Sequence, residues 1–250
     1  MKKIFSVIIL VCLVLPLSAK ARQMRAIAVR TYPHDVSSFT QGLFFHNGVL
    51  YESVGQYGSS AIMKTDLKSG RQTQREDLHR RYFAEGSCSL NGVIYTLTWQ
   101  EGTCFVYDPE SLETISSFRY YGEGWGLTTD GKSLISSDGS ATLIWRDPDT
   151  FQELSSKTVT LNGKALSLLN ELEWIDGKIW ANVYGSNNIV VIDPETAQVE
   201  QVIDCSALPS FPKREIENVL NGIAADPATG KIYVTGKLWP TLYEIRVQAK

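Results

Sequence analysis

The chain has 250 residues, of which 43% are hydrophobic and 20% are charged, and its formal net charge is −3 at pH 7. This length and composition are typical of one folded domain rather than of a disordered or fibrous chain. The charge is weakly acidic and the lysines and arginines are scattered, so we do not expect nucleic acid or an anionic membrane surface as a partner.

The first residues have the pattern of a secretory signal. A basic start, Met1 to Lys3, precedes an apolar run from Ile4 to Leu17, and the small residues of Ala19-Lys20-Ala21 follow it. The apolar run is shorter than the roughly 20 residues that a membrane span needs. We therefore expect residues 1–21 to be a signal peptide and residues 22–250 to be one exported domain, either periplasmic or secreted, with no membrane attachment after cleavage.

One pattern then occurs five times along the chain. Each copy has a polar or glycine-containing start, a short apolar run, a tight turn and a second strand-like run. The starts are Gln41-Gly42-Leu43, Glu85-Gly86-Ser87, Trp125-Gly126-Leu127, Asn170-Glu171-Leu172 and Asn221-Gly222-Ile223. The turns are Asn47-Gly48, Asn91-Gly92, Asp130-Gly131, Asp176-Gly177 and Ala228-Thr229-Gly230. Asn-Gly and Asp-Gly favour tight β-hairpins, and internal repetition of this kind indicates a repeat architecture.

The repeats predict an all-β fold. The runs after the turns are rich in β-branched and aromatic residues, and two further strands fit into each copy. Four short strands in roughly 40–50 residues are typical of a propeller blade, so we predict a five-bladed β-propeller with four-stranded blades. The last copy ends after its third strand, and an extra strand, Arg25 to Thr31, precedes the first copy. We expect this N-terminal strand to complete the last blade, which removes an exposed edge.

Blade topology brings distant residues to one face of the ring. The first strand of a blade is innermost and the second runs antiparallel beside it, so the start of one and the end of the other share a face. The strand starts should therefore ring one mouth of the central channel, through Gln41, Glu85, Trp125, Asn170 and Asn221. The residues after the second strands should lie above the same mouth, namely Trp99, Asp138, Tyr184 and Lys237.

Glu85 is the candidate catalytic group at this mouth. A carboxyl group among the indoles of Trp99 and Trp125 loses hydration, which raises its pKa and suits it to exchange a proton near neutral pH. Glu123 and Glu171 are further candidate acids close by. The residues also allow a purely structural reading, in which the indoles only pack between blades.

Cysteine and histidine do not indicate a metal site. The three cysteines after the leader are Cys88, Cys104 and Cys205, so at least one has no partner within the chain. Cys88 and Cys104 fall in neighbouring strands, and the sequence leaves their pairing open. The histidines at positions 34, 46 and 79 lack the spacing of metal ligands, so we expect no zinc site.

Several motifs along the whole chain, taken together, resemble one enzyme family. They include Phe39-Thr40-Gln41-Gly42-Leu43, Phe83-Ala84-Glu85-Gly86, Leu97-Thr98-Trp99, Gly124-Trp125-Gly126-Leu127, Leu169-Asn170-Glu171-Leu172-Glu173, Ala181-Asn182-Val183, Leu220-Asn221-Gly222-Ile223-Ala224 and Val234-Thr235-Gly236-Lys237-Leu238-Trp239-Pro240. With these segments, the chain from about Tyr32 to Val247 resembles the plant and bacterial type of glutaminyl cyclase.

The resemblance implies a five-bladed propeller and a glutaminyl-peptide cyclotransferase that converts N-terminal glutamine of peptides or proteins into pyroglutamate and releases ammonia. It implies that no metal or other cofactor is required, although a structural ion in the channel stays open. Glu85 matches the acid/base glutamate, and the substrate-binding positions match Gln41, Trp99, Trp125, Asn170 and Lys237. Tyr184 stands where the family usually has tryptophan, and we expect it to bind substrate as well, because it keeps the aromatic wall. A closed ring needs no partner, so we expect a monomer.

Two alternatives remain open from the sequence. The first is a non-catalytic exported propeller that binds a peptide or a sugar at its mouth. The second is a metal-dependent propeller lactonase, in which Glu85, Asn170 and Asn221 form an oxygen cage for a divalent ion, because fold alone does not determine function.

Overall fold

The computed structural model describes residues 20–208 and 217–250. Residues 1–19 of the predicted signal peptide, residues 1–21, lie outside the described residues, whereas Ala21 is 5% exposed and its backbone nitrogen donates a hydrogen bond of 2.9 Å to Oδ1 of Asn162. Within the described ranges, no helix is long and apolar enough to cross a membrane.

The described residues form strands and no helix, which confirms the predicted all-β class. Three sheets have four antiparallel strands each. The first contains β2 (Thr40–His46), β3 (Val49–Val54), β4 (Ala61–Asp66) and β5 (Arg71–Asp77). The second contains β6 (Ala84–Leu90), β7 (Val93–Thr98), β8 (Thr103–Tyr107) and β9 (Thr114–Arg119). The third contains β10 (Leu127–Thr129), β11 (Leu134–Ser137), β12 (Thr142–Arg146) and β13 (Glu153–Thr158).

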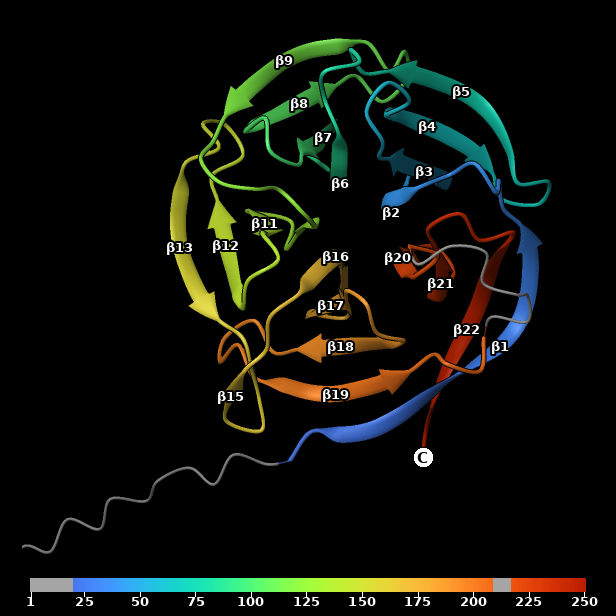
Figure 1. Ribbon diagram of the computed structural model, residues 1–250, viewed down its shortest axis with the longest axis vertical. Helices are drawn as coiled ribbons and strands as arrows, with labels where there is room; N and C mark the ends of the chain where they lie inside the picture. The colour runs from blue at the N-terminus through green and yellow to red at the C-terminus, as the bar shows by residue number, and fades with distance from the viewer. Residues whose placement is uncertain (1–19, 209–216) are drawn as a thin grey trace, which may run out of the picture.

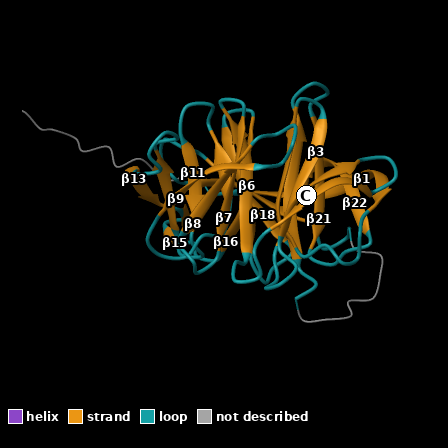
Figure 2. Ribbon diagram, turned by 90° about the horizontal axis from the view of Figure 1, so that it is seen from above, coloured by secondary structure: helices purple, strands orange, loops and turns teal. Residues whose placement is uncertain are grey.

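A fourth sheet has eight strands. Their order is β16 (Leu169–Ile175), β17 (Lys178–Val183), β18 (Asn188–Ile192), β19 (Val199–Asp204), β1 (Arg22–Pro33), β22 (Thr241–Ala249), β21 (Lys231–Gly236) and β20 (Leu220–Asp226). A small hairpin joins β14 (Thr160–Leu161) to β15 (Lys164–Ala165). Figure 1 shows the sheets arranged around a central axis, with β2, β6, β16 and β20 nearest to it. Figure 2 shows the strands running between two faces that carry the loops.

The hairpin turns follow from their sequence. In Asn47-Gly48, Asn91-Gly92 and Asp176-Gly177 both residues have positive φ, between 48° and 79°. Asparagine, aspartate and glycine tolerate this left-handed backbone, and two such residues make the turn that matches the twist of the flanking strands. The inner strands that these turns join are almost wholly buried, whereas outer strands such as β9 are mostly exposed.

The N-terminal strand β1 connects the two ends of the chain. It pairs antiparallel with β22, from Met24 opposite Ala249 to Pro33 opposite Thr241. Its first residues also pair parallel with β19, where Arg22 lies opposite Gln201. The strand predicted over Arg25 to Thr31 thus lies in β1, beside the C-terminal strand. This pairing leaves no free edge between β19 and β22 and ties the ring together.

The inner strands approach one another so closely that side chains are excluded at some positions. A Cβ atom added to Gly86 would lie 2.4 Å from the backbone nitrogen of Leu127, and one added to Gly126 would lie 2.0 Å from the carbonyl oxygen of Asn170. Real Cβ atoms do not approach backbone this closely, so these two positions require glycine. The repeat starts therefore contain glycine because the inner strands pack closely at the axis.

The three cysteines of the described ranges are buried free thiols. Cys88 and Cys104 lie in neighbouring strands, β6 and β8 of one sheet, but no disulfide joins them. Burial raises the pKa of both thiols, which makes them unreactive at neutral pH. They therefore act as small core residues.

A buried histidine holds the loop that carries Lys237. His34 follows β1, and its Nδ1 lies 2.6 Å from the carbonyl oxygen of Trp239 while its Nε2 lies 3.1 Å from Oε1 of Glu52. A carbonyl oxygen only accepts hydrogen bonds, and so does a carboxylate, so these two contacts favour the protonated imidazole, in which both ring nitrogens donate. Burial alone would lower the pKa of His34, but the charge of Glu52 and the hydrogen bonds to Glu52 and Trp239 raise it above its ordinary value.

We expect this pair to make the free energy of unfolding depend on pH. The pKa of His34 is higher in the folded protein than the roughly 6.5 of the unfolded chain, so its stabilisation is complete below about pH 6.5 and is lost as pH rises through the folded value. Urea unfolding of the wild type and of His34→Gln, from about pH 6 to pH 10, measures the difference, which should shrink as pH rises. A difference that stays constant over this range would contradict the prediction.

Candidate functional site

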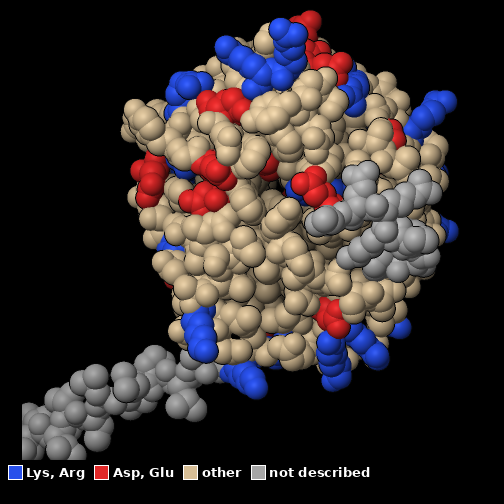
Figure 3. Space-filling model, in the orientation of Figure 1, with Lys and Arg blue, Asp and Glu red and all other residues tan. Residues whose placement is uncertain are grey.

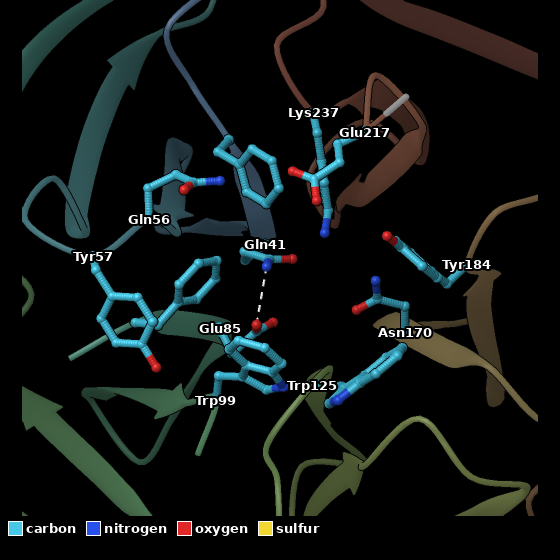
Figure 4. Close-up of a pocket in the computed structure, with 12 residues that line it drawn as sticks. Gln41, Gln56, Tyr57, Glu85, Trp99, Trp125, Asn170, Tyr184, Glu217 and Lys237 are labelled. Atoms are coloured by element: carbon cyan, nitrogen blue, oxygen red, sulfur yellow. Dashed lines mark hydrogen bonds between the residues drawn. The ribbon is translucent and has the colours of Figure 1, made fainter. Parts of the chain in front are cut away.

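A cavity of about 440 Å³ opens at one end of the ring axis (Figure 4). Figure 3 shows a hollow near the middle of this face, with acidic and basic side chains on its rim. Twelve residues line the cavity, and they are Phe39, Gln41, Gln56, Tyr57, Phe83, Glu85, Trp99, Trp125, Asn170, Tyr184, Glu217 and Lys237. All seven residues that the sequence analysis selected as catalytic or substrate-binding are among them.

Two kinds of position supply these seven side chains. Gln41, Glu85 and Asn170 lie at the starts of inner strands β2, β6 and β16, and Trp125 precedes inner strand β10. Trp99, Tyr184 and Lys237 follow directly after β7, β17 and β21. Antiparallel pairing of the first and second strands brings both sets to one face, as the blade topology predicted.

The inner strands are irregular where they enter the site. The pairing register shifts between Thr40 and Gly42, between Ala84 and Ser87, and between Leu169 and Leu172. Gln41, Glu85 and Asn170 lie inside these shifts and are thus released from the regular alternation of side chains. Bulges of this type redirect side chains, and they are common beside active sites.

Glu85 is the most deeply buried carboxyl group of the pocket lining. It is 5% exposed, and its Oε1 accepts a hydrogen bond of 3.0 Å from Nε2 of Gln41. Loss of hydration is the main cause that raises the pKa of Glu85 well above its ordinary value. The positive charge of Lys237 opposes this shift, and the negative charges of Glu123 and Glu101 add to it. A carboxyl group with its pKa raised in this way is suited to exchange a proton with a ligand.

The amide of Gln41 is oriented by a residue beneath the pocket. Nδ2 of Asn221 donates to Oε1 of Gln41 at 3.2 Å and to the carbonyl oxygen of Thr40 at 2.9 Å. The amide nitrogen of Gln41 is thereby directed at Glu85 (Figure 4). Asn221 was predicted to ring the mouth, but it is completely buried and does not line the cavity. Asn221 therefore lies behind Gln41 and supports its amide group.

Lys237 lies opposite Glu85 and is 4% exposed. Its ammonium lies over two aromatic rings, 4.5 Å from the centre of Phe39 and 5.2 Å from the centre of Tyr184. Burial lowers the pKa of Lys237, while the charges of Glu85 and Glu217 act in the other direction. The lysine therefore faces the pocket as a poorly hydrated donor.

Aromatic rings form the walls of the cavity. Trp99 packs edge-on against Phe83, with centroids 5.6 Å apart, and Trp125 packs edge-on against Tyr184, with centroids 5.7 Å apart. Tyr184 thus forms part of the aromatic wall, at the position where the family usually has tryptophan. Rings of this size exclude water from a small pocket.

Three other candidates of the sequence analysis lie outside the cavity lining. Glu171 is buried and accepts hydrogen bonds from the backbone nitrogens of Leu43 and Ile223, at 3.3 and 2.9 Å. Asp138 accepts a hydrogen bond from the backbone nitrogen of Ser140 and so stabilises a turn. Glu123 lies at the rim, where it accepts hydrogen bonds from both pocket indoles.

Five lining residues were not selected from the sequence, namely Phe39, Gln56, Tyr57, Phe83 and Glu217. Phe39 and Phe83 lie two positions before Gln41 and Glu85, and this shared spacing in two repeats is a signal that could have identified them. Gln56 and Tyr57 lie in the loop between β3 and β4, and Glu217 lies before β20; the repeats share these loop positions but not the residues in them, so the repeat pattern does not single these three out.

Of the three residues of the oxygen cage in the lactonase alternative, Glu85 and Asn170 line the cavity and Asn221 does not. In residues 20–208 and 217–250, no group of three or more histidine, cysteine, aspartate or glutamate side chains is arranged to hold a metal ion.

Comparisons with known proteins agree with one another. The sequence profile of a family described as "Glutamine cyclotransferase" matches residues 5–247. A glutaminyl-peptide cyclotransferase of Arabidopsis thaliana is 39% identical over 240 residues, which cover 94% of this chain and 74% of that protein. The crystal structure of Myxococcus xanthus glutaminyl cyclase superposes with a TM-score of 0.87 at 38% identity, covering 92% of this chain and 100% of that one. The similarity thus extends over nearly the whole chain.

Proposed function

The chain belongs to the glutamine cyclotransferase family, and we propose that its pocket converts the N-terminal glutamine of peptides or proteins into pyroglutamate with release of ammonia. Family membership confirms the resemblance inferred from the motifs. The observation that best supports a catalytic pocket is the buried carboxyl group of Glu85, enclosed by aromatic rings and opposed by the ammonium of Lys237.

We also propose that the ring has five blades of four strands within a single catalytic domain, residues 22–250. In this interpretation the eight-stranded sheet is two blades, β16 to β19 and β20 to β22 with β1. The antiparallel pairing of β1 with β22 supports it, since β1 then supplies the outermost strand of the last blade. The shorter parallel pairing with β19 joins this blade to its neighbour.

The nucleophile is the α-amine of the substrate itself, so the enzyme needs no serine or cysteine nucleophile. This amine attacks the side-chain carboxamide carbon, a new C–N bond closes the five-membered ring, and the original C–N bond breaks to release ammonia. The amine must be neutral to attack, and with a pKa of about 8 it is partly so near neutral pH. A pocket that folds the glutamine side chain so that amine and carbonyl meet accelerates this closure by orientation.

Glu85 moves the proton in this scheme. It accepts a proton from the attacking amine and delivers it to the leaving nitrogen, so that no net proton is consumed. The hydrogen bond from Gln41 supports the role because it holds one carboxyl oxygen and leaves the other for the substrate. The aromatic walls formed by Trp99, Trp125 and Tyr184 enclose the aliphatic part of the glutamine and keep the carboxyl group dry.

Two further polar residues, Asn170 and Lys237, would bind an N–H and the carbonyl oxygen of the substrate. The amide oxygen of Asn170 is buried and has no hydrogen-bond partner among the described residues, which suits it to accept an N–H of the substrate. Nε2 of Gln41 already donates one hydrogen bond to Glu85, so we assign Lys237 as the main donor to the carbonyl oxygen as negative charge develops on it.

We further propose that the reaction needs no metal and that the enzyme is exported after removal of residues 1–21. The polar groups described above account for every proton and charge of the scheme, which supports the first point. Ammonia release from a glutaminyl peptide should therefore be unchanged in EDTA, and a lactone should not be hydrolysed. Activity that EDTA abolishes and zinc restores would refute metal independence, and lactone hydrolysis without ammonia release would favour the lactonase alternative.

Glu85→Gln should lower kcat for a glutaminyl peptide by roughly 10²- to 10⁴-fold, because an amide cannot transfer the proton. Glu113, an exposed glutamate outside the cavity lining, supplies the matched control Glu113→Gln, which should keep full activity. Steady-state ammonia release measures both variants. A fully active Glu85→Gln protein would overturn the assignment of Glu85.

Lys237→Met should lower kcat more than it raises KM, because a group that stabilises the developing charge acts in the transition state rather than in substrate binding. Lys237→Arg keeps the positive charge and should retain more activity than the methionine variant. The comparison uses kcat and KM for the same peptide. If KM rises while kcat is unchanged, Lys237 is a binding residue instead.

A further inference from the structure

Glu123 lies in the loop between β9 and β10 and connects two walls of the pocket that come from different sheets. Its Oε2 accepts a hydrogen bond from Nε1 of Trp99 at 2.8 Å and another from Nε1 of Trp125 at 3.0 Å. Its Oε1 accepts a weaker bond of 3.3 Å from Nε2 of Gln100. Figure 4 shows the nitrogen edges of the two indoles turned toward each other, which is the arrangement that a shared acceptor requires.

This carboxylate completes a belt of contacts around the cavity. The ring-to-ring contacts are Phe39 with Phe83 at 6.1 Å, Phe83 with Trp99 at 5.6 Å and Trp125 with Tyr184 at 5.7 Å between centroids. Lys237 links Tyr184 to Phe39 through its ammonium. Glu123 makes the remaining link, between Trp99 and Trp125. The two indoles are thus held together by one side chain.

The chemistry of Glu123 suits this task. The hydrogen bond from Trp125, followed by those from Trp99 and Gln100, lowers the pKa of Glu123, so the group is ionised at neutral pH. An ionised carboxylate is acceptor-only and makes strong hydrogen bonds to N–H donors. It therefore fixes the nitrogen edges of both indoles, each of which belongs to a residue of the cavity lining. Without it, the N–H groups would turn toward other acceptors, including water.

We propose that Glu123 is a positioning residue, which locks Trp99 and Trp125 in the orientation that folds the glutamine side chain and keeps water from Glu85. The inference rests on the proposed cyclisation, because that reaction is what the oriented walls would serve. It does not require Glu123 to touch the substrate, since this residue lies outside the cavity lining.

The test compares Glu123→Ala with Glu123→Gln, in the wild type and in a Trp99→Phe/Trp125→Phe protein. Glu123→Ala should lower kcat/KM for a glutaminyl peptide by about 10²-fold, as misplaced positioning groups do. Glu123→Gln keeps an acceptor oxygen and should lose less than about tenfold. In the double-phenylalanine protein no indole N–H remains at either position, so Glu123→Ala should change kcat/KM by less than about threefold. Two results would overturn the proposal, because either would mean that the charge of Glu123 acts directly on the reaction. One is an equal loss of kcat/KM in Glu123→Gln and Glu123→Ala. The other is a full loss of kcat/KM on Glu123→Ala in the double-phenylalanine protein.

A spectroscopic measurement separates this inference from the function itself. In ¹⁵N-labelled protein, Glu123→Ala should move the indole N–H signals of Trp99 and Trp125 and speed their exchange with water. The signals of the four other tryptophans should stay in place, which also shows that the variant is folded. Wild-type protein that releases no ammonia would contradict the proposed function alone, whereas unmoved Trp99 and Trp125 signals would overturn the link through Glu123.

Discussion

The close approach of the inner strands at the axis is the constraint on which the site depends. Gly86 and Gly126 have no room for a side chain, so the strands β6, β10 and β16 meet backbone to backbone. The side chain of Glu85 starts on β6 where these strands meet and lies at the cavity, 5% exposed, so its carboxyl group keeps little of its hydration. The desolvation that raises its pKa is therefore a consequence of how the strands pack, rather than of any one neighbour.

Two opposite charges share this dry space without neutralising each other. Burial favours the uncharged forms of both Glu85 and Lys237, while each charge partly restores the other. In a direct ion pair the two groups would satisfy each other and leave little for a ligand. Here Glu85 is hydrogen-bonded to Gln41, and Lys237 is held over the rings of Phe39 and Tyr184. The space between them can thus receive a neutral, polar side chain such as a carboxamide.

Sequence periodicity predicted the features that depend on connectivity. Turn residues and strand starts were sufficient to bring Gln41, Glu85 and Asn170 to one mouth, together with the residues that follow the second strands. Periodicity could not predict side-chain direction within the irregular strand starts. Asn221 occupies the same repeat position as Asn170 yet turns beneath the pocket, because its amide donates to Thr40 and Gln41. Glu123 lies in a loop, and only the orientation of two indoles reveals what it does.

Buried glutamates illustrate why partners, rather than burial, decide what a carboxyl group does. Glu52 contacts the buried ring of His34 and accepts a hydrogen bond from the hydroxyl of Thr40, and its role is to hold a loop. Glu171 accepts two backbone N–H groups from different inner strands, which makes it a tie between them. Glu85 has one amide partner and an open side toward the cavity. Only this last arrangement leaves an oxygen free to exchange a proton with a ligand, and this distinguishes Glu85 from the other two as a chemical group.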